Sequence, residues 1–333
     1  MEYGIWYLFV TDSRQDQLTA FVKSIILEDE IMLLPLNGDA SFRRYFRVSG
    51  KNLIAVDAPP QTQKNKEFIS IDKALASEKV KVPNILAFDL ENGFMLLEDL
   101  GNTTFAQVAI GTTAEAYYLK AIDLLGPVAK VISKVELPLF DDEFVKFELS
   151  LFETWMLDKR LGVKLSDEEK QDINDAYEYI CNSLKQLPFV AMHRDFHSRN
   201  LMVFGNELAV IDFQDMVKGP ITYDLASLVY DCYVVLDKAL VNKCIDRAYA
   251  KYCELNLLNG MEKREFVRLL NITSLQRHIK VLGIFCRLSI RDGKNGYLKD
   301  LPRVINYVLD ECKNDTHFSK LSNIIKKYVV GNF

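Results

Sequence analysis

The stretch His193–Asn200, with the sequence HRDFHSRN, combines residue types that could transfer a phosphoryl group. Its spacing fits the pattern H-R-D-x-x-x-x-N without a gap. In this pattern Asp195 would orient an acceptor hydroxyl and take its proton, while Asn200 would reach a metal ion. Phosphoryl transfer needs little covalent help from a protein, so the motif predicts chemistry that depends on the placement of these two side chains.

A further carboxylate follows twelve residues after Asn200. Asp212 stands at the end of an apolar run, in the segment Ile211–Gln214, where a second metal ligand would be needed. A single aspartate more often caps a helix or lies on the surface. The order and spacing of Asp195, Asn200 and Asp212 together nevertheless favour a metal-dependent phosphotransfer site.

Short apolar runs typical of strands bracket these polar residues. Two of them, Leu201–Phe204 and Leu208–Ile211, flank a Gly-Asn turn signal at residues 205–206 and predict a hairpin with both metal ligands at one end. The run Phe189–Met192 precedes the catalytic motif. The strands would therefore position the catalytic and metal-binding side chains.

The first residue of the motif and one residue beyond it are interpreted as structural. His193 could act as a base or a ligand, but in such a loop it more often holds the backbone. Asp224 lies in the first turn of a helix expected to open at Tyr223, where it would cap that helix or hold the catalytic loop. We therefore place neither residue among the catalytic groups.

The remainder of the chain divides into two parts with different periodicity. Residues 14–30 have the spacing of an amphipathic helix, and β-like segments with one helix over Phe68–Leu75 follow as far as residue 100. After Gly101 the spacing is nearly all helical. We expect an α+β fold, with a small, mostly antiparallel N-terminal lobe at residues 1–100 and a larger, mainly helical lobe at residues 101–333. The strand candidates in the first lobe are Tyr45–Val48, Leu53–Val56, Ile85–Phe88 and Phe94–Leu97.

Composition limits the classes of partner. With 49% hydrophobic and 26% charged residues, the chain of 333 residues can bury a large core. Its net charge of −5 argues against a nucleic-acid binder, which needs a basic excess. Six cysteines without a C-x-x-C pair favour a reducing compartment, and the apolar stretch Ile5–Val10 is too short for a signal or a membrane span. We expect a cytoplasmic monomer that binds a small molecule, and neither nucleic acid nor a membrane.

The motif resembles a known superfamily. His193–Asn200 followed by Ile211–Asp215 is similar to the aminoglycoside phosphotransferase and choline kinase superfamily of kinase-like enzymes, and further segments resemble the branch of bacterial N-acetylmuramate and N-acetylglucosamine anomeric kinases. The resemblance implies a protein-kinase-like fold and ATP-dependent phosphorylation of the anomeric hydroxyl of an N-acetylated amino sugar, in peptidoglycan recycling. The segments similar to that branch are Leu36–Arg47, Asp57–Pro60, Leu97–Gly101, Asp212–Asp215, Gln276–Phe285, Arg291–Lys294 and Leu301–Arg303.

The resemblance also implies roles for individual residues. Asp195 would be the base, and Asn200 and Asp212 would hold Mg²⁺. The hinge Glu98–Leu100 would bind adenine through its backbone groups, and the loop Gly38–Arg44 would cover the phosphates of ATP. The nucleotide-binding candidates are accordingly Gly38, Ser41, Arg43, Arg44, Glu98 and Leu100.

One departure from the kinase pattern concerns the phosphates. A lysine is expected on the strand that here reads Ile54-Ala55-Val56-Asp57, and none is present. We hypothesise that Arg43 or Arg44 supplies the missing positive charge, because a guanidinium matches phosphate oxygens. Alternatively, both arginines lie on a solvated strand edge.

The acceptor side is the least defined part of the site. His197, Arg199 and Asp215 are candidate contacts to the acceptor because they adjoin the catalytic residues. Trp155 could stack on a sugar face or merely pack in a helix interface.

Two alternative functions remain open. The acceptor could be another small alcohol, such as an aminoglycoside, choline or homoserine, and Asp141-Asp142-Glu143 could then receive a cationic group. The absent strand lysine would also suit a pseudokinase that binds nucleotide without turnover, although the complete set of Asp195, Asn200 and Asp212 counts against it.

Overall fold

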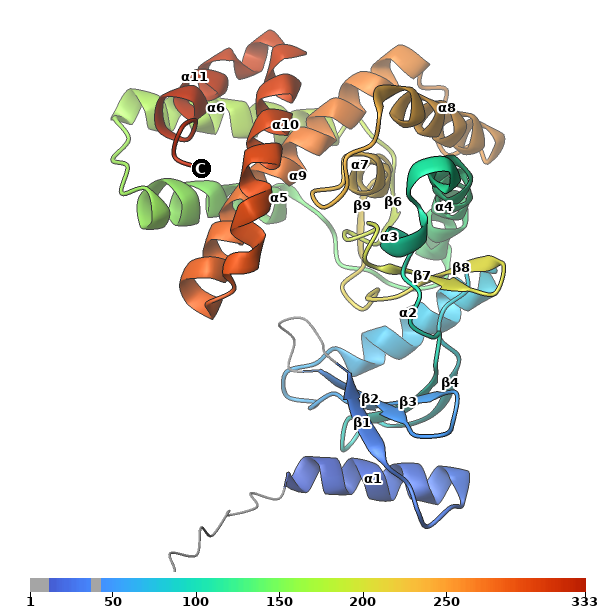
Figure 1. The fold of residues 1–333 in the computed structure, drawn as a ribbon. Coiled ribbons are helices and arrows are strands. Elements are labelled where there is room, and N and C mark those ends of the chain that lie inside the picture. The colour runs from blue at the N-terminus through green and yellow to red at the C-terminus, as the bar shows by residue number, and fades with distance from the viewer. Residues whose placement is uncertain (1–11, 37–42) are drawn as a thin grey trace, which may run out of the picture.

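The structure is a computed structural model that describes residues 12–36 and 43–333. It contains a β-sheet part formed by the described residues up to 100 and a helical part formed by most of the rest (Figure 1). The α+β fold expected from the sequence, with a small, mostly antiparallel sheet part and a larger, mainly helical part, is confirmed. The two loop candidates Gly38 and Ser41, and the stretch Ile5–Val10, lie outside the described residues.

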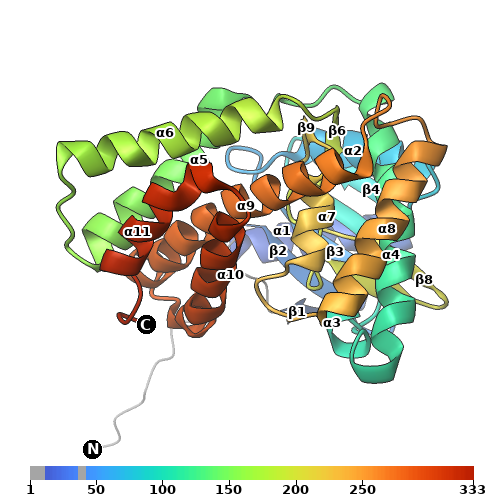
Figure 2. The ribbon, with the colours of Figure 1, turned by 90° about the horizontal axis from the view of Figure 1, so that it is seen from above.

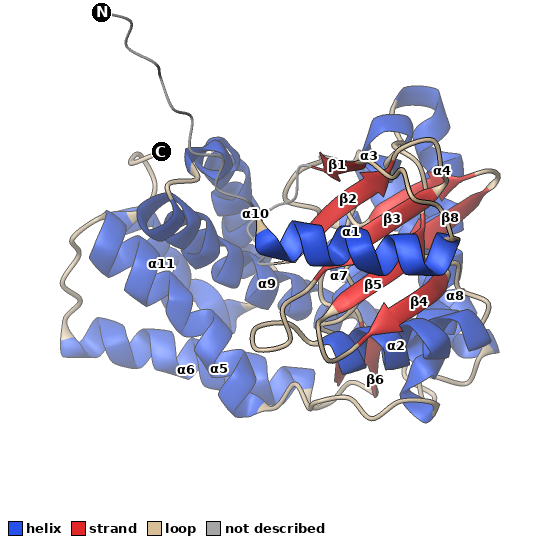
Figure 3. Ribbon diagram, turned by 90° about the horizontal axis from the view of Figure 1, so that it is seen from below, coloured by secondary structure: helices blue, strands red, loops and turns tan. Residues whose placement is uncertain are grey.

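The N-terminal part is built on a five-stranded antiparallel sheet in the order β1-β2-β3-β5-β4. Four of these strands were predicted, and β1 was not. Helix α1, Ser13–Ile26, lies across one face of the sheet (Figure 3), where Leu18 and Val22 pack on Phe46 and Leu96. The strands are β1 Leu33–Leu36, β2 Arg44–Val48, β3 Leu53–Asp57, β4 Ile85–Asp89 and β5 Phe94–Glu98.

The opposite face of the sheet packs on helix α2, Asn65–Ser77. Successive side chains of a strand point to opposite faces, so Val56 and Met95 join Phe68 of α2 in the main core, whereas Ala55 and Leu96 face α1. Helix α2 therefore lies between the sheet and the helical part (Figure 1).

The helical part surrounds one long central helix. Helix α9, Lys263–Asp292, is buried over most of its middle, and in the view of Figure 2 it runs between α6 and α10. It approaches the junction between α5 and a π-helical segment, Phe152–Arg160, so closely that a Cβ on Gly283 would lie 2.3 Å from the backbone of Leu151. The other helices are α3 Phe105–Val108, α4 Ala114–Lys130, α5 Asp142–Leu151, α6 Asp167–Leu184, α7 Tyr223–Val229, α8 Lys238–Glu254, α10 Leu301–Lys313 and α11 Ser319–Tyr328.

Two short strand pairs lie between the sheet part and the helices. Strands β7, Leu201–Phe204, and β8, Glu207–Val210, form the predicted hairpin. Strand β6, Phe189–Met192, pairs with β9, Val217–Pro220, a strand that the sequence did not suggest. The catalytic motif follows β6, and the Asp212 segment connects β8 to β9. No helix within residues 12–36 and 43–333 is long and apolar enough to cross a membrane.

Candidate active site

The loop that carries the catalytic motif connects β6 to β7. Its backbone is strained, because Arg194 has a φ of 76°, in the left-handed region that side chains rarely adopt. The carboxylate of Asp224 accepts hydrogen bonds from the backbone N–H groups of His193, at 2.7 Å, and of Arg194, at 3.0 Å. Asp224 therefore fixes the loop in this conformation, which agrees with the prediction that it caps its helix or holds the catalytic loop.

His193 also holds the backbone. Its Nε2 lies 2.9 Å from the carbonyl oxygen of Ile211, so this nitrogen carries the proton and donates. This bond joins the catalytic loop to the residue that precedes Asp212. The structural role predicted for His193 is consistent with this contact.

A buried carboxylate holds the arginine of the motif. Glu148 on α5 is 3% exposed and accepts hydrogen bonds from Arg194 Nη2, at 2.8 Å, and from Gln276 Nε2, at 3.1 Å. Lys280 Nζ on α9 lies 2.9 Å from the same carboxylate. Burial alone would raise the pKa of Glu148, but Lys280 and Arg194 outweigh it and hold this pKa below its usual value. The carboxylate is therefore ionised.

Asp195 lies beside these cations. Burial by itself would raise its pKa, but nearby positive charges, of which that of Lys280 has the largest effect, lower the pKa to about 2. Asp195 is thus ionised at neutral pH and able to accept a hydrogen bond from an acceptor hydroxyl.

The two candidate metal ligands lie together. Asn200 Nδ2 lies 3.5 Å from Asp212 Oδ2 and donates to the carbonyl oxygen of Asp195, at 3.0 Å. Asp212 has a φ of 65°, a second left-handed residue at this site. The described residues contain no cluster of three or more His, Cys, Asp or Glu side chains that could hold a metal. One carboxylate and one amide oxygen suit Mg²⁺, which is usually bound by few protein oxygens and by phosphates.

The Asp212 segment is docked onto the N-terminal part. The Phe213 ring stacks on Phe68 of α2, with ring centroids 4.8 Å apart. Gln214 donates through Nε2 to Asp212 Oδ1, at 2.9 Å, and its Oε1 lies 3.4 Å from Arg43 Nη1. Arg43 is buried and its guanidinium lies over the Phe68 ring. Gln214 therefore connects Arg43, a nucleotide-binding candidate, to Asp212, a metal-ligand candidate.

Arg44 has different surroundings. Its Nε lies 2.9 Å from Oδ2 of Asp57, and the guanidinium also pairs with Asp12. Asp57 is buried and pairs with Arg14 of α1 as well. The Arg44 charge is therefore neutralised by two carboxylates, at the junction of α1 and the sheet.

The candidate hinge follows β5. The Glu98 carboxylate accepts hydrogen bonds from Lys81 Nζ, at 2.5 Å, and from the backbone N–H of Asn84, at 3.1 Å. The side chain of Leu100 is buried, and its backbone groups have no hydrogen-bond partner among the described residues. This arrangement suits recognition of a base by backbone groups.

The three acceptor candidates lie in different environments. His197 is near Asp195, and burial lowers its pKa more than the charges of Asp195 and Asp231 raise it, so the ring is neutral at pH 7. The Arg199 guanidinium lies 3.6 Å from the ring centroid of Tyr233. Asp215 pairs with Lys64 Nζ at 2.7 Å, which links the catalytic side of the site to the start of α2.

A small polar cavity adjoins Asp195. It has a volume of about 100 Å³, and its polar lining includes Asp195, His197, Asp231, Tyr233, Arg277 and Lys280. Arg199 and Asp215 do not line it. Sequence reasoning did not assign roles to Arg277 and Lys280. The sequence does show a run of polar and charged residues in the middle of a long helix. Such residues need polar partners if they are buried, and this could have indicated a site.

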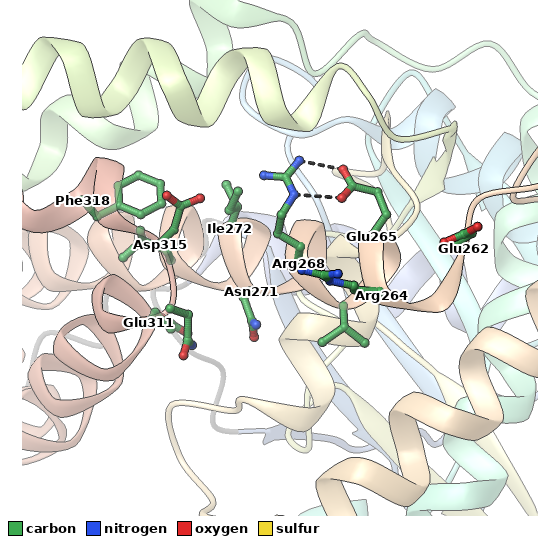
Figure 4. A pocket seen from close by; sticks show the side chains of 12 residues that line it. Glu262, Arg264, Glu265, Arg268, Asn271, Ile272, Glu311, Asp315 and Phe318 are labelled. Carbon is green, nitrogen blue, oxygen red and sulfur yellow. Dashed lines mark hydrogen bonds and ion pairs between the residues drawn. The ribbon is translucent and has the colours of Figure 1, made fainter.

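Size alone does not locate the site. A larger concavity, of about 590 Å³, lies beside α9 and is lined by Glu262, Glu265, Arg268, Glu311 and Asp315, among others (Figure 4). Arg268 is paired there with Glu265. None of the catalytic-loop residues reaches this surface.

Two further candidates from the sequence take structural positions. Asp141 caps helix α5 by accepting the backbone N–H of Phe144, and Asp142 pairs with Lys185, so this acidic run forms a helix start. Trp155 packs against the main core and does not line the polar cavity.

Comparison with known sequences identifies relatives along nearly the whole chain. The phosphotransferase enzyme family matches residues 33–266. An N-acetylmuramate/N-acetylglucosamine kinase of Pseudomonas aeruginosa is 38% identical over 332 residues, covering 96% of this chain and 98% of the relative. A protein of the same name from Neisseria meningitidis is 35% identical over 302 residues, covering 89% and 90%.

Comparison with solved structures shows the same fold at low sequence identity. A choline kinase from Cryptosporidium parvum superposes with a TM-score of 0.65 at 11% identity, covering 93% of this chain and 98% of that one. The ADP-bound aminoglycoside phosphotransferase APH(2'')-Ib superposes with a TM-score of 0.57 at 15% identity, covering 87% and 97%.

Proposed function

Because the chain belongs to the phosphotransferase enzyme family, we propose that it transfers the γ-phosphate of ATP to the anomeric hydroxyl of an N-acetylated amino sugar. The substrates would be N-acetylmuramate and N-acetylglucosamine, and the product a sugar 1-phosphate. The observation that carries this proposal is the close grouping of Asp195, Asn200 and Asp212. The chain that contains this group is 38% identical to an N-acetylmuramate/N-acetylglucosamine kinase.

Asp195 is proposed as the base. Its low pKa makes it a weak base, so its main contribution is to orient the hydroxyl while bond breaking at the γ-phosphorus proceeds. The oxygen of the anomeric hydroxyl forms a bond to the γ-phosphorus, the bond to the β-phosphate oxygen breaks, and the hydroxyl proton passes to Asp195. ADP leaves with the electron pair of the broken bond.

Asn200 and Asp212 are proposed to hold Mg²⁺ through their side-chain oxygens. When bound, the ion would neutralise charge on the phosphates. Gln214 fixes one oxygen of Asp212 with a hydrogen bond, and Asn200 is held by the backbone of Asp195. These contacts orient the two ligand side chains before nucleotide binds.

Arg43 is proposed to supply the positive charge that the strand lysine gives in protein kinases. It is buried and connected to the Asp212 segment through Gln214, whereas Arg44 is already paired with Asp57 and Asp12. Glu98 and Leu100 would form the adenine hinge, with the backbone of Leu100 facing the base.

We further propose that the protein acts as a monomer in the cytoplasm, in peptidoglycan recycling. ATP dependence and six cysteines without a disulfide support the location. The names of the relatives support the pathway, because both sugars are building blocks of the cell wall.

The experiment that tests the function is an acceptor panel. Purified protein with Mg-ATP should release ADP with N-acetylmuramate or N-acetylglucosamine, and not with choline, homoserine or an aminoglycoside. If the protein turns over choline, homoserine or an aminoglycoside and neither sugar, it is a phosphotransferase, but the proposed substrate is wrong. A protein that binds ATP and turns over no acceptor would be a pseudokinase.

A further inference from the structure

The polar cavity beside Asp195 is sized for part of an acceptor. Pockets that hold a whole small-molecule ligand usually have volumes of roughly 300 to 1,000 Å³, whereas this cavity has a volume of about 100 Å³. A sugar whose reacting hydroxyl meets Asp195 could therefore place one substituent in it. Recognition of that substituent depends on the cavity's charged side chains.

Arg277 lines this cavity, and only part of its guanidinium is hydrogen-bonded. The residue is 6% exposed, and its Nη2 donates to Ser227 Oγ at 2.8 Å. Its Nε and Nη1 are buried and have no hydrogen-bond partner in the part of the chain that the structure describes. Among the described residues, no carboxylate forms an ion pair with it. Burying a charge without a partner is costly, so this guanidinium is suited to receive an anion.

The neighbouring carboxylates are occupied by other donors. Glu148 is bound by Arg194 and Lys280. Asp231 accepts the backbone N–H groups of Ser198, at 3.0 Å, and of Tyr233, at 2.7 Å. Lys280 already has Glu148 as its partner. Within residues 12–36 and 43–333, Arg277 is therefore the cation of the cavity lining that lacks a bound carboxylate.

We propose that Arg277 binds a carboxylate on the acceptor, which in N-acetylmuramate is the carboxylate of the lactyl group. The inference rests on the proposed function and adds a residue that distinguishes the two sugars, since N-acetylglucosamine has no such group. A guanidinium binds a carboxylate by charge-assisted hydrogen bonds. The same charge disfavours a cationic substituent in the cavity, as choline or an aminoglycoside would present.

The test compares three variants with both sugars. Arg277→Met should lower kcat/KM for N-acetylmuramate by about tenfold or more, the value of a charge-assisted hydrogen bond, and change kcat/KM for N-acetylglucosamine less than about threefold. Arg277→Lys should restore part of the loss, because it keeps the charge. Arg268→Met is the matched control, since Arg268 lies on the same helix and outside the cavity.

A change in the substrate provides the second arm. N-acetylmuramate with its carboxylate converted to a carboxamide should be a poorer substrate for the wild-type protein, and Arg277→Met should cause little further loss with it. Equal losses for both sugars, or equal losses for the acid and its amide, would overturn the proposal. Circular dichroism of each variant separates these results from misfolding. A wild-type protein that turns over neither sugar would instead refute the proposed function.

Discussion

Arg44 is held against Asp57, with its Nε 2.9 Å and its Nη2 2.6 Å from Oδ2 of that carboxylate. Asp57 ends the strand on which a kinase lysine was expected, so an acid occupies the end of this strand and an arginine on β2 neutralises it. The pair connects two strands and, through Arg14, helix α1. The two adjacent arginines of this region therefore have different partners, and they can be tested separately.

Arg43→Ala should lower kcat/KM for ATP by about tenfold or more, because it removes a charge-assisted contact to phosphate. Arg44→Ala should leave this quantity within about threefold of wild type and lower the Tm by a few degrees, because it removes a partner of buried Asp57. Initial rates at varied ATP and thermal melts measure both. If Arg43→Ala leaves nucleotide kinetics unchanged, Arg43 does not replace the lysine.

Glu148→Gln should destabilise the fold by roughly 3 to 5 kcal/mol, since Arg194 and Lys280 would be left buried without their anion. Urea denaturation followed by circular dichroism measures the free energy of unfolding. Glu143→Gln on the same helix is the control, because Glu143 is exposed. A loss no larger than that of the control would show that Glu148 does not neutralise this cluster.

Lys64 and Asp215 form an ion pair between the start of α2 and the segment after Asp212. Both side chains are about half exposed, so the pair should add less than about 1 kcal/mol to stability. If it helps to hold the two parts together during turnover, Lys64→Ala and Asp215→Ala should lower kcat/KM for ATP by similar factors, and the double variant should lose no more than either single one. Strictly additive losses in this double-mutant cycle would show that the residues act independently.

Asp72 on α2 should make stability depend on pH. The residue is 5% exposed, and burial raises its pKa to about 7 despite Lys73 and Lys81. In an unfolded chain the pKa of an aspartate is about 3.9. The folded state therefore binds more protons between about pH 4 and 7, and its stability falls as pH rises through that window.

Asp72→Asn removes this penalty, so its Tm should exceed that of wild type at pH 8 and match it near pH 4. Thermal melts at the two pH values test the expectation, with exposed Glu67→Gln on the same helix as control. A Tm difference that is the same at both pH values would contradict a raised pKa of Asp72.

Much of the site could be predicted because it is local in sequence. The catalytic loop, the hairpin and Asp212 lie within twenty residues of one another, and a fixed spacing predicts a fixed geometry. Likewise, β3 to β5 are short, mostly apolar runs, and turn signals separate the strands from β2 to β5. These features do not depend on distant contacts.

The parts that sequence reasoning missed depend on tertiary packing. Strand β9 contains a glycine and a proline and is held by pairing with β6. Arg277 and Lys280 were visible as charges in a helical run, but their position in a cavity beside Asp195 follows from tertiary packing. The neutralisation of Arg44 by Asp57 and Asp12 likewise becomes visible only once α1 is placed on the sheet.

The central claim is that Asp195 directs transfer of phosphate to the anomeric oxygen. Wild-type protein should convert N-acetylmuramate and Mg-ATP to a product whose phosphorus NMR signal couples to the anomeric proton, which identifies a sugar 1-phosphate. Asp195→Asn should lower kcat by about 10² to 10⁴ while it leaves the KM for ATP nearly unchanged, because it removes the carboxylate that orients the hydroxyl and takes its proton but leaves the nucleotide site intact. A phosphate on any other oxygen, or an Asp195→Asn variant with undiminished kcat, would contradict the account.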